Sequence, residues 1–396
     1  MRALLKKKKK SFSGRARTKT DRPLLKRVFY RILLVINIVL GLSLLMSYLA
    51  VNINPEDFAL PAFFGLAYPY ILLLNIFIVI GWAMLLRFEA LISVVLIALG
   101  AGHFLNYIQL FRTKEDKAGT FKVISYNVHA FNYFEANKGA TSVKNVMNFI
   151  KSVKPEIICM QEFFFAGEQS QVAPMVNNST GIKYNSHLKL LGSGKNKYYG
   201  VATFTSYPII KKGEVVHPGS SSLTIYTDVV IRNDTFRIYN NYLQSFRLKK
   251  MERSFFEEIT SAEDKETEMR NLSARLKKGF VSRSNQAQLV RDHIRKSLYP
   301  VIVAGDFNDT PVSYAYRRIR RGLNDSFVNS GYGAGFTYKG NYPPNRIDYI
   351  LYDNALVNNN FEIIKVRFSD HYPIMAYFRR NTKRPLPNPS PKAGGA

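Results

Sequence analysis

The chain has 396 residues, which is enough for one large domain or two ordinary ones. It contains 56 Lys+Arg against 28 Asp+Glu, a net charge of +28 that favours anionic partners such as nucleic acid, phospholipid headgroups or free phosphoesters. The only cysteine, Cys159, excludes an intramolecular disulfide and a zinc site built from cysteines.

The first 31 residues form a basic tail. They carry thirteen Lys or Arg, including the run from Lys6 to Lys10, and one acid, Asp21. Basic residues before a first apolar span favour the cytoplasmic side of a membrane. We therefore interpret this run as a topology signal that places residues 1–31 in the cytoplasm, with nucleic-acid binding as the alternative.

Three apolar stretches follow, at residues 32–51, about 66–86 and about 88–110. A helix of about 20 apolar residues crosses the hydrocarbon core of a membrane, because each residue adds about 1.5 Å. We expect three transmembrane helices within residues 32–110, the last two forming a hairpin around "RFE" at 87–89. A cleaved signal peptide is the alternative for the first stretch, but two further spans would not follow it.

Three crossings would place the rest of the chain on the side opposite the tail. Arg87, in the short second loop, agrees with a cytoplasmic turn. From Phe111 onward there are 42 basic and 24 acidic residues, so this part carries +18. We expect a multi-pass protein of the bacterial inner membrane with an extracytoplasmic domain at residues 118–380.

That domain shows short strands alternating with helices. Val, Ile, Tyr and Phe dominate eight segments bounded by turn residues, which is typical of strands. The predicted strands are 121–128, 156–163, 198–206, 223–231, 235–243, 300–307, 346–353 and 372–378. Asn233-Asp234 predicts a hairpin turn between the fourth and the fifth.

Two regions predict helices. Apolar residues recur at helical spacing over residues 141–153. Residues 250–297 are strongly charged and contain one glycine, Gly279, so they predict one or two amphipathic helices, the second at about 284–297, within an insert at 245–297. Residues 381–396 have too few apolar side chains to pack and predict a disordered tail.

Several predicted strands end in acids, amides or a histidine. The segments are "ISYNV" with Asn127, "ICMQE" with Glu162, "VIVAGDFN" with Asp306 and Asn308, "RIDY" with Asp348, and "FSDHYP" with Asp370 and His371. Each alone has a plain structural alternative, namely a turn cap, an exposed acid, a post-strand turn or a helix N-cap. Together they indicate a cation, because carboxylates beside buried strands repel one another, and oxygen ligands suit Mg²⁺ or Mn²⁺. The histidine suits an imidazole oriented by a carboxylate.

The ordered motifs "SYNV", "PEIICMQE", "NNYLQS", "GDFND", "RIDYIL" and "SDHYP" resemble those of the endonuclease/exonuclease/phosphatase superfamily over about residues 118–380. That superfamily includes deoxyribonuclease-type nucleases, abasic-site endonucleases, inositol polyphosphate 5-phosphatases and bacterial sphingomyelinases. The resemblance implies an α/β (α+β) fold, a four-layer sandwich of two mixed β-sheets flanked by helices, here preceded by the three predicted transmembrane helices. It also implies divalent-metal hydrolysis of phosphoester bonds, with Mg²⁺ or Mn²⁺ as the cofactor.

The resemblance suggests which residues hold the metal and activate water. Glu162 would be the principal metal ligand, helped by Asn127, which would also orient Asp306. Asp370 would complete the acidic set near the metal. Asp306 would position and deprotonate the attacking water.

It also suggests which residues bind the phosphate. Asn308 would donate to the phosphoryl oxygens, and His371, its tautomer fixed by Asp348, would hydrogen-bond the phosphate or act as a general acid or base. Many members have a histidine in an "NTHL" strand, whereas residues 240–243 read "NNYL", which is similar to the abasic-site endonuclease branch. Tyr242 could still donate its phenol to phosphate, but the absence of the histidine puts a second general acid in doubt. An ordinary strand aromatic is the alternative for Tyr242.

These features predict a membrane-anchored, metal-dependent phosphoester hydrolase. It would be a nuclease or a phosphatase/phosphodiesterase, acting on nucleic acid, phospholipid or inositol phosphate, with no obligate protein partner. The basic residues of 245–297 and "RRIRRG" at 317–322 could contact a nucleic-acid backbone, lipid headgroups or only solvent. The alternative function is a catalytically silent membrane receptor or scaffold that retains the fold.

Overall fold

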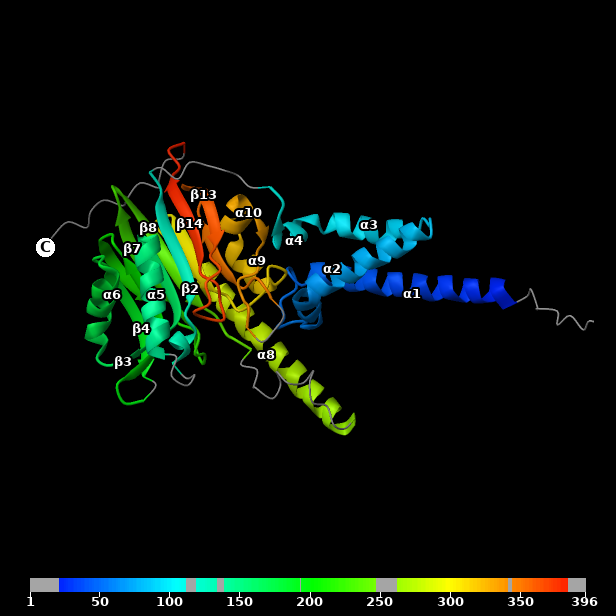
Figure 1. The fold of residues 1–396 in the computed structure, drawn as a ribbon, viewed down its shortest axis with the longest axis horizontal. Coiled ribbons are helices and arrows are strands. Elements are labelled where there is room, and N and C mark those ends of the chain that lie inside the picture. The colour runs from blue at the N-terminus through cyan, green and yellow to red at the C-terminus, as the bar shows by residue number, and fades with distance from the viewer. Residues whose placement is uncertain are drawn as a thin grey trace, which may run out of the picture.

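The computed structural model describes residues 21–111, 119–133, 139–192, 194–246, 262–340 and 344–383. Most of the basic tail and of the tail predicted at residues 381–396 lies outside this part of the chain, as do residues 247–261 of the predicted insert. Figure 1 shows two parts, an arm of helices from the N-terminal residues and a sandwich of sheets and helices from the remainder.

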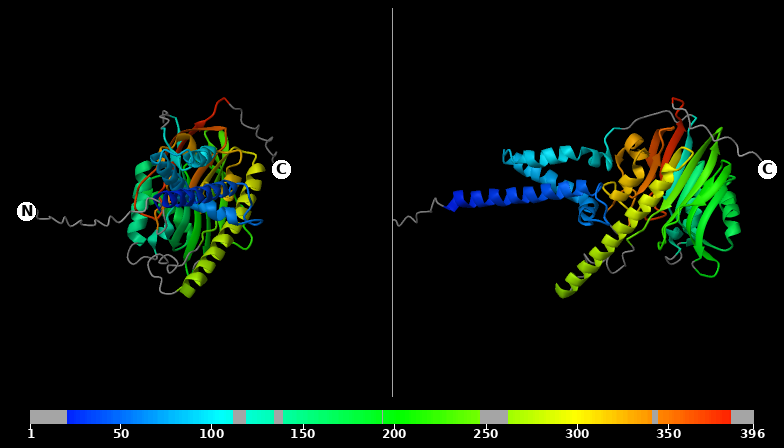
Figure 2. Two further views of the ribbon diagram at one scale, coloured as in Figure 1. Left: turned by 90° about the vertical axis from the view of Figure 1, so that its right-hand side faces the viewer. Right: turned by 180° about the vertical axis from the view of Figure 1, so that it is seen from behind.

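The arm consists of four helices. They are α1 (Asp21–Leu49), α2 (Leu60–Met84), α3 (Ala90–Leu99) and α4 (Ala101–Leu105). α1 runs toward the sandwich, α2 runs away from it, and α3 with α4 leads the chain back, as the views from two sides show (Figures 1 and 2). By length and apolar composition, α1 over Leu24–Leu49 and α2 are able to cross a membrane.

The predicted third span is wrong as a single helix, since two helices, not three, have that length in the described chain. Residues 88–110 instead form the ten-residue α3 and the five-residue α4, separated at Gly100. Glycine is a weak helix residue, and Tyr48 of α1 occupies the space beside it. A Cβ added at Gly100 would meet the Tyr48 hydroxyl at 1.9 Å, and that hydroxyl donates to the Leu96 carbonyl (3.0 Å) in the last turn of α3.

A buried polar cluster joins α1, α2 and α3. The Ser93 hydroxyl lies 2.6 Å from Asn37 Oδ1 and 3.0 Å from Asn75 Oδ1. The two amide nitrogens donate to backbone carbonyls, Asn37 to Glu89 and Asn75 to Leu40 and Ile71. Hydrogen bonds between polar side chains of this kind stabilise helix contacts within an apolar arm.

Two six-stranded mixed sheets form the centre of the sandwich, in the orders β13-β14-β2-β3-β5-β4 and β10-β12-β9-β8-β7-β6. The strands of the first are β2 (Phe121–Asn127), β3 (Ile157–Ala166), β4 (Asn185–Gly192), β5 (Lys197–Thr205), β13 (Leu356–Ile363) and β14 (Ile374–Arg380). Those of the second are β6 (Ile209–Glu214), β7 (Leu223–Ile231), β8 (Asp234–Tyr242), β9 (Val301–Asp306), β10 (Asn324–Asp325) and β12 (Asp348–Tyr352). The short strands β1 (Ile108–Gln109) and β11 (Gly333–Ala334) pair with each other.

Alternating side chains build the layers, because successive residues of a strand point to opposite faces. In β3, Ile157 and Cys159 face the other sheet, whereas Ile158 and Met160 pack under α5 (Gly139–Val153) and α6 (Val172–Thr180). The outer face of the second sheet packs on α8 (Ala262–Arg295) and α9 (Tyr314–Arg320). The remaining helical segments are η1 (His129–Asn132), η2 (Gln169–Gln171) and α10 (Ser326–Ser330). The result is the predicted four-layer α/β sandwich.

The predicted elements agree with the structure in most places. All eight predicted strands are confirmed, each within three residues at either end, and the helix predicted at 141–153 is α5. Six strands of the described chain were not predicted. β1, β10 and β11 have only two residues each, β4 and β6 are partly exposed strands at the sheet edges, and β13 contains an asparagine run. In the described residues of the insert, one helix, α8, continues through Gly279, which is the single-helix form of the prediction. Because Ile231 pairs with Asp234, the hairpin turn is Arg232-Asn233, one residue earlier than predicted.

The helical arm packs directly on the loop that follows β9. Val312 of that loop is fully buried in a cluster with Leu44, Val51, Tyr68 and other arm residues. Gly65 of α2 makes this approach possible, because an added Cβ would lie 2.3 Å from the Val312 carbonyl oxygen. The arm and the sandwich therefore share one packed interface.

We expect Gly65→Ala to lower the thermal stability of the full chain, by roughly 1–3 kcal/mol, because its methyl group overpacks this interface. Gly81→Ala, in the same helix, is the matched control, since an added Cβ there meets nothing within 4 Å. The control should be neutral or stabilising by about 0.5–1 kcal/mol. Thermal unfolding of both variants in detergent measures the difference, and equal midpoints would refute a tight contact at Gly65.

Candidate functional site

Strand ends from both sheets meet at one edge of the sandwich. In the second sheet β8 and β9 are parallel and end side by side at Tyr242 and Asp306. β12 runs antiparallel to β9 and begins at Asp348, directly opposite Asp306. The register therefore places two acids and a phenol at the same end of three neighbouring strands.

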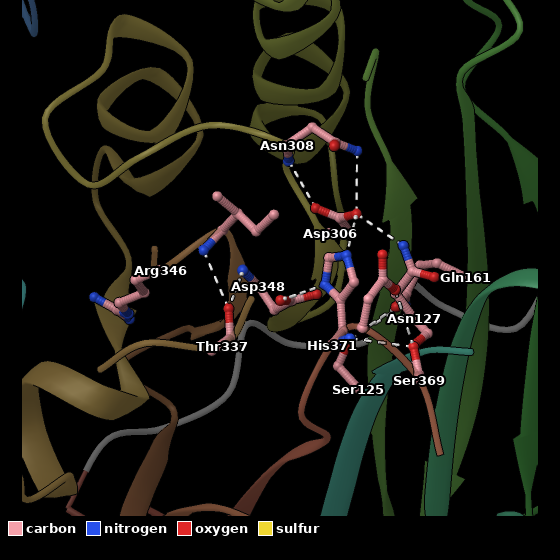
Figure 3. A network of polar contacts seen from close by, with 12 residues as sticks. Ser125, Asn127, Gln161, Asp306, Asn308, Thr337, Arg346, Asp348, Ser369 and His371 are labelled. Carbon is pink, nitrogen blue, oxygen red and sulfur yellow. Dashed lines mark hydrogen bonds and ion pairs between the residues drawn. The ribbon is translucent and has the colours of Figure 1, made fainter. Parts of the chain in front are cut away.

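The first sheet contributes an amide and a third acid. β2 ends at Asn127, and the parallel strand β3 carries Glu162 at a bulge, where the pairing with β5 is interrupted. Glu162 has a φ of 51°, an unusual value for a residue other than glycine that often marks a functional site. Asn127 Nδ2 donates to Asp306 Oδ2 (2.9 Å; Figure 3). The same nitrogen donates to Glu162 Oε1 (3.1 Å), so one amide joins the carboxylates of the two sheets.

His371 lies between the two acids of the second sheet. Its Nδ1 donates to Asp348 Oδ2 (2.9 Å), and its Nε2 is 3.9 Å from Asp306 Oδ2. Ser369 fixes the segment that carries it, because the hydroxyl accepts from the His371 N–H (3.1 Å) and donates to the Asn127 carbonyl (2.8 Å). Figure 3 shows these contacts around the buried imidazole.

Burial and nearby charges shift the pKa values of His371 and Asp306. Burial alone would lower the pKa of His371, but the carboxylates of Asp348 and Asp306 outweigh it and raise that pKa to about 10. Burial, with the nearby charge of Asp348, raises the pKa of Asp306 to about 7, against the opposing effects of His371 and Asn127. These shifts favour a protonated imidazole at His371 and a carboxyl group at Asp306 that holds its proton more tightly than an ordinary aspartate.

Asn308 and Tyr242 also reach the site. Asn308, with a φ of 51°, donates from its amide nitrogen to Asp306 Oδ2 (3.1 Å) and to the Leu243 carbonyl (3.0 Å). The Tyr242 hydroxyl donates to Glu162 Oε1 (3.0 Å). Burial and the charge of Glu162 raise the pKa of Tyr242 well above its ordinary value, so the phenol remains a neutral donor. The geometry gives Tyr242 a polar contact in the site that an ordinary strand aromatic would lack.

Asp370 pairs with a histidine near the site. Its carboxylate lies 3.0 Å from Nδ1 of His129, and this histidine was not singled out from the sequence. Against the effect of burial, hydrogen bonding and the charges of His129 and His371 lower the pKa of Asp370 to about 2. The pair lies beside the site, since His129 follows Asn127 by two residues in the segment "NVHA".

Two further buried amides were missed. Gln161 Nε2 donates to Asn240 Oδ1 (2.7 Å), and Asn240 Nδ2 donates to the carbonyls of Met160 (3.2 Å) and Ala202 (3.1 Å). They join the two sheets next to the site. Their signal in the sequence was a polar residue inside each of two apolar strands, adjacent to Glu162 in one case and two residues before Tyr242 in the other.

The donor set fits a hard divalent cation. Glu162, Asp306 and Asp348 supply carboxylate oxygens, and Asp348 Oδ1 is buried with no hydrogen-bond partner among the described residues. Asp306, Asp348 and His371 place potential ligand atoms within 4.8 Å of one another. A protonated imidazole has no lone pair for a metal, however, so the carboxylates, Glu162 among them, are better candidates for ligands than His371. Ligation by Asn127, Glu162 and Asp370 stays a prediction.

A model of the Endonuclease/Exonuclease/phosphatase family matches residues 124–371, which is more than half of the chain and includes every residue of this site. The chain belongs to the endonuclease/exonuclease/phosphatase family. Members of this family hydrolyse phosphoester bonds and are typically dependent on divalent metals. A second model, described as a domain of unknown function, matches residues 30–107 and covers most of the helical arm. No match is found among curated proteins.

Solved structures with a similar fold include other endonuclease/exonuclease/phosphatase proteins. One is a family protein from Leptotrichia buccalis, with 18% identity and a TM-score of 0.46 over 65% of this chain and 98% of that one. TDP2 from Caenorhabditis elegans has 18% identity and a TM-score of 0.45 over 66% of this chain and 75% of that one. The protein from Bacteroides vulgatus has 17% identity and a TM-score of 0.48 over 66% and 99%.

If the site binds a divalent cation, Mg²⁺ should stabilise the folded chain. At a concentration of about 100 times Kd, the expected gain in unfolding free energy is about 2.7 kcal/mol. Glu162→Gln should lose most of this gain, whereas Glu168→Gln, an exposed acid beyond the same strand, should keep it. Thermal unfolding with Mg²⁺ and with EDTA measures the effect; equal gains in both variants would exclude Glu162 as a ligand.

Proposed function

We propose that the chain is a membrane-anchored, divalent-metal-dependent phosphoester hydrolase in which Asp306 activates water for attack on phosphorus. The observation that carries the proposal is the arrangement of Asp306 opposite Asp348, with His371 Nε2 3.9 Å from Asp306, inside the span that matches the family. A base, a cationic donor and a set of oxygen ligands lie within reach of one phosphate.

Asp306 supplies the base. Its Oδ1 accepts the N–H of Asn308 (2.8 Å) and its Oδ2 accepts the Asn127 amide (2.9 Å), so the carboxylate is held in one orientation. A base whose pKa lies near the working pH takes a proton from water most effectively. The raised pKa of Asp306 therefore suits proton abstraction from the attacking water.

Three side chains would supply hydrogen-bond donors for the phosphate, those of His371, Asn308 and Tyr242. With Nδ1 bonded to Asp348, the protonated His371 directs its Nε2–H toward Asp306 and the space beside it. There it offsets charge on a phosphoryl oxygen, together with the amide of Asn308. The phenol of Tyr242, bonded to Glu162, lies at the end of the strand next to Asp306.

Glu162, with Asn127, would hold the metal. A bound Mg²⁺ or Mn²⁺ offsets negative charge on the phosphate and lowers the pKa of water. Asp370 is held by His129 and would act on the metal through its charge.

The arm supports membrane anchoring. Its helices expose large apolar side chains to the surroundings, among them Leu73, Phe77 and Ile80 of α2 and Leu91 and Val95 of α3. Apolar surface of this extent is stable in lipid and unfavourable in water.

An aromatic and basic group marks the end of the arm that is far from the sandwich. Arg87 lies over the ring of Tyr30 (5.2 Å), which stacks on Trp82 (6.3 Å), as is usual at a membrane interface. The 20 residues from Tyr30 to Leu49, where α1 ends, correspond to about 30 Å of helix, the thickness of a hydrocarbon core.

The same geometry supports the predicted orientation. α1 follows the basic tail, and it ends next to the sandwich, where Leu44 and Val51 pack with Val312. If the tail is cytoplasmic, the hydrolase domain is extracytoplasmic. α2 and the broken segment α3–α4 then lead out and back to the same side.

Nucleic acid, phospholipid and inositol phosphate all remain open as substrates. A hollow of about 520 Å³ between α8 and the loop after β6 adjoins the site, since Gln244 lines it and the preceding Leu243 carbonyl accepts from Asn308. Arg275 and Lys278 also line it, which favours a substrate with a second anionic group.

Asp306→Asn should lower kcat by about 10²–10⁴ through loss of the base, and His371→Gln by about 10²–10³ through loss of a charged donor. The full chain in detergent with Mg²⁺ would be assayed against plasmid DNA, sphingomyelin and inositol phosphates. Asp353→Asn, just beyond the far end of the strand that begins at Asp348, is the matched control and should leave the rate unchanged. Hydrolysis that both active-site variants retain, or no hydrolysis of any substrate, would refute the proposal.

The orientation can be tested with β-lactamase fused to the chain in a bacterial host. Fusion after residue 383, at the end of the described sandwich, should protect cells from ampicillin, because the reporter works only outside the cytoplasm. Fusion after Leu86, at the far end of the arm, should not protect. The opposite pattern would place the hydrolase domain in the cytoplasm.

A further inference from the structure

A second hollow, of about 950 Å³, lies where the arm meets the sandwich. One wall belongs to the arm and includes Val51, Leu99 and Leu105. The other belongs to α9 and the residues after it, and it contains the arginines of the segment "RRIRRG". No residue of the hydrolase site described above lines this hollow.

Four arginines of this short segment line the hollow, and none of them forms a direct ion pair with an acidic side chain among the described residues. Arg318 donates to Gln288 Oε1 (2.5 Å), and Arg320 donates to Asn106 Oδ1 (2.8 Å) and the Tyr316 hydroxyl (2.7 Å), all neutral partners. Arg317 and Arg321 are exposed and have no hydrogen-bond or ion-pair partner in the part of the chain that the structure describes. These two guanidiniums are available to a ligand.

The neighbouring surface of α8 adds to the positive charge. Burial lowers the pKa of Arg291, and the nearby charges of Arg295, Arg321 and Arg318 lower it further, against the smaller opposing effect of Asp292. Like charges this close repel one another, and an anion bound among them would relieve the repulsion.

The apolar wall identifies the kind of anion. Leu99 is 72% exposed, and Val95 and Leu91, at 54% and 56%, continue its apolar surface along α3 away from the sandwich. About 30 Å of helix separates the interfacial residue Tyr30 from Leu49, where α1 ends. Val51, which lines the hollow, follows two residues later, so it lies at the level of the opposite headgroup layer. A nucleic acid would gain nothing from this apolar strip, whereas acyl chains would cover it.

We propose that this hollow binds the headgroup of one anionic phospholipid, with its phosphate on Arg317 and Arg321 and its acyl chains along α3. Guanidinium groups bind phosphate oxygens in a two-pronged geometry and suit this role. The site is separate from the hydrolase centre, so the lipid is a bound component and not a substrate. The inference rests on the proposed membrane insertion of the arm.

The test measures lipid retained by the full chain, purified in neutral detergent containing equal amounts of phosphatidylglycerol and phosphatidylcholine with identical acyl chains. Native mass spectrometry should show phosphatidylglycerol retained in preference by the wild-type chain. Arg317→Gln/Arg321→Gln should lower that retention by roughly 10- to 30-fold, because each basic residue near a membrane surface contributes about a factor of five. Lys211→Gln/Lys212→Gln, which removes two exposed charges from the edge strand β6, is the matched control and should retain as much as wild type.

Competition distinguishes the possible sources of the phosphate. Glycerophosphoglycerol, the soluble headgroup, should compete only weakly, and a 20-residue single-stranded DNA should not compete. Full displacement by the soluble headgroup would make this a site for free phosphoesters, and displacement by DNA would make it a nucleic-acid surface; either result overturns the lipid assignment. Equal retention by the arginine variant and wild type overturns it as well.

Failure of this inference can be told apart from failure of the proposed function. Both double variants should unfold at the wild-type temperature and hydrolyse a soluble phosphoester at the wild-type rate, since none of the four residues lies in the hydrolase site. A wild-type chain that does not enter vesicles contradicts membrane anchoring, and the lipid site with it. A chain that enters vesicles and hydrolyses substrate, but whose arginine variant retains phosphatidylglycerol, contradicts the lipid site alone.

Discussion

Asp306 and Asp348 lie opposite each other on paired strands, and both side chains are buried. Two carboxylates this close and this deep repel each other strongly unless positive charge lies between them. A protonated His371 would supply part of that charge, and the raised pKa of Asp306 agrees with incomplete compensation of the two carboxylates. The cation proposed for this edge of the sandwich would offset the remaining negative charge.

Asn127 connects this centre to the rest of the sandwich. Its amide donates to one acid from each sheet, so the relative position of the two sheets sets the distance between Glu162 and Asp306. Gln161 and Asn240 join the sheets next to it with further buried hydrogen bonds. Such a network is stable only when every member is satisfied, which gives the site a rigid support within the interior between the sheets.

The helical arm packs against the segments that carry Asp306 and Asp348. Val312, six residues after Asp306, is buried among arm residues, and Arg346, two residues before Asp348, donates to the Asn106 carbonyl beyond α4 (2.9 Å). Arg346 also pairs with buried Asp325 (2.5 Å), and breaking such a pair leaves an uncompensated charge. A sandwich domain produced without the arm would expose Val312 and Arg346 to solvent. These residues lie within six positions of Asp306 and Asp348 in the sequence. The full chain is therefore the appropriate unit for functional measurements.

The amino-acid sequence by itself determined the apolar first two helices, the eight main strands and the polar residues at the ends of several of them, because periodicity and turn chemistry are local properties. It did not predict β4, β6 and β13, whose partly exposed or asparagine-rich segments lack a strong strand pattern. It missed the pairing of Asp370 with His129, 241 positions apart in the chain, and the break at Gly100, which depends on Tyr48 of another helix. Only the tertiary structure decided these features, since strand register and helix packing choose which distant side chains meet, and no local pattern records that choice.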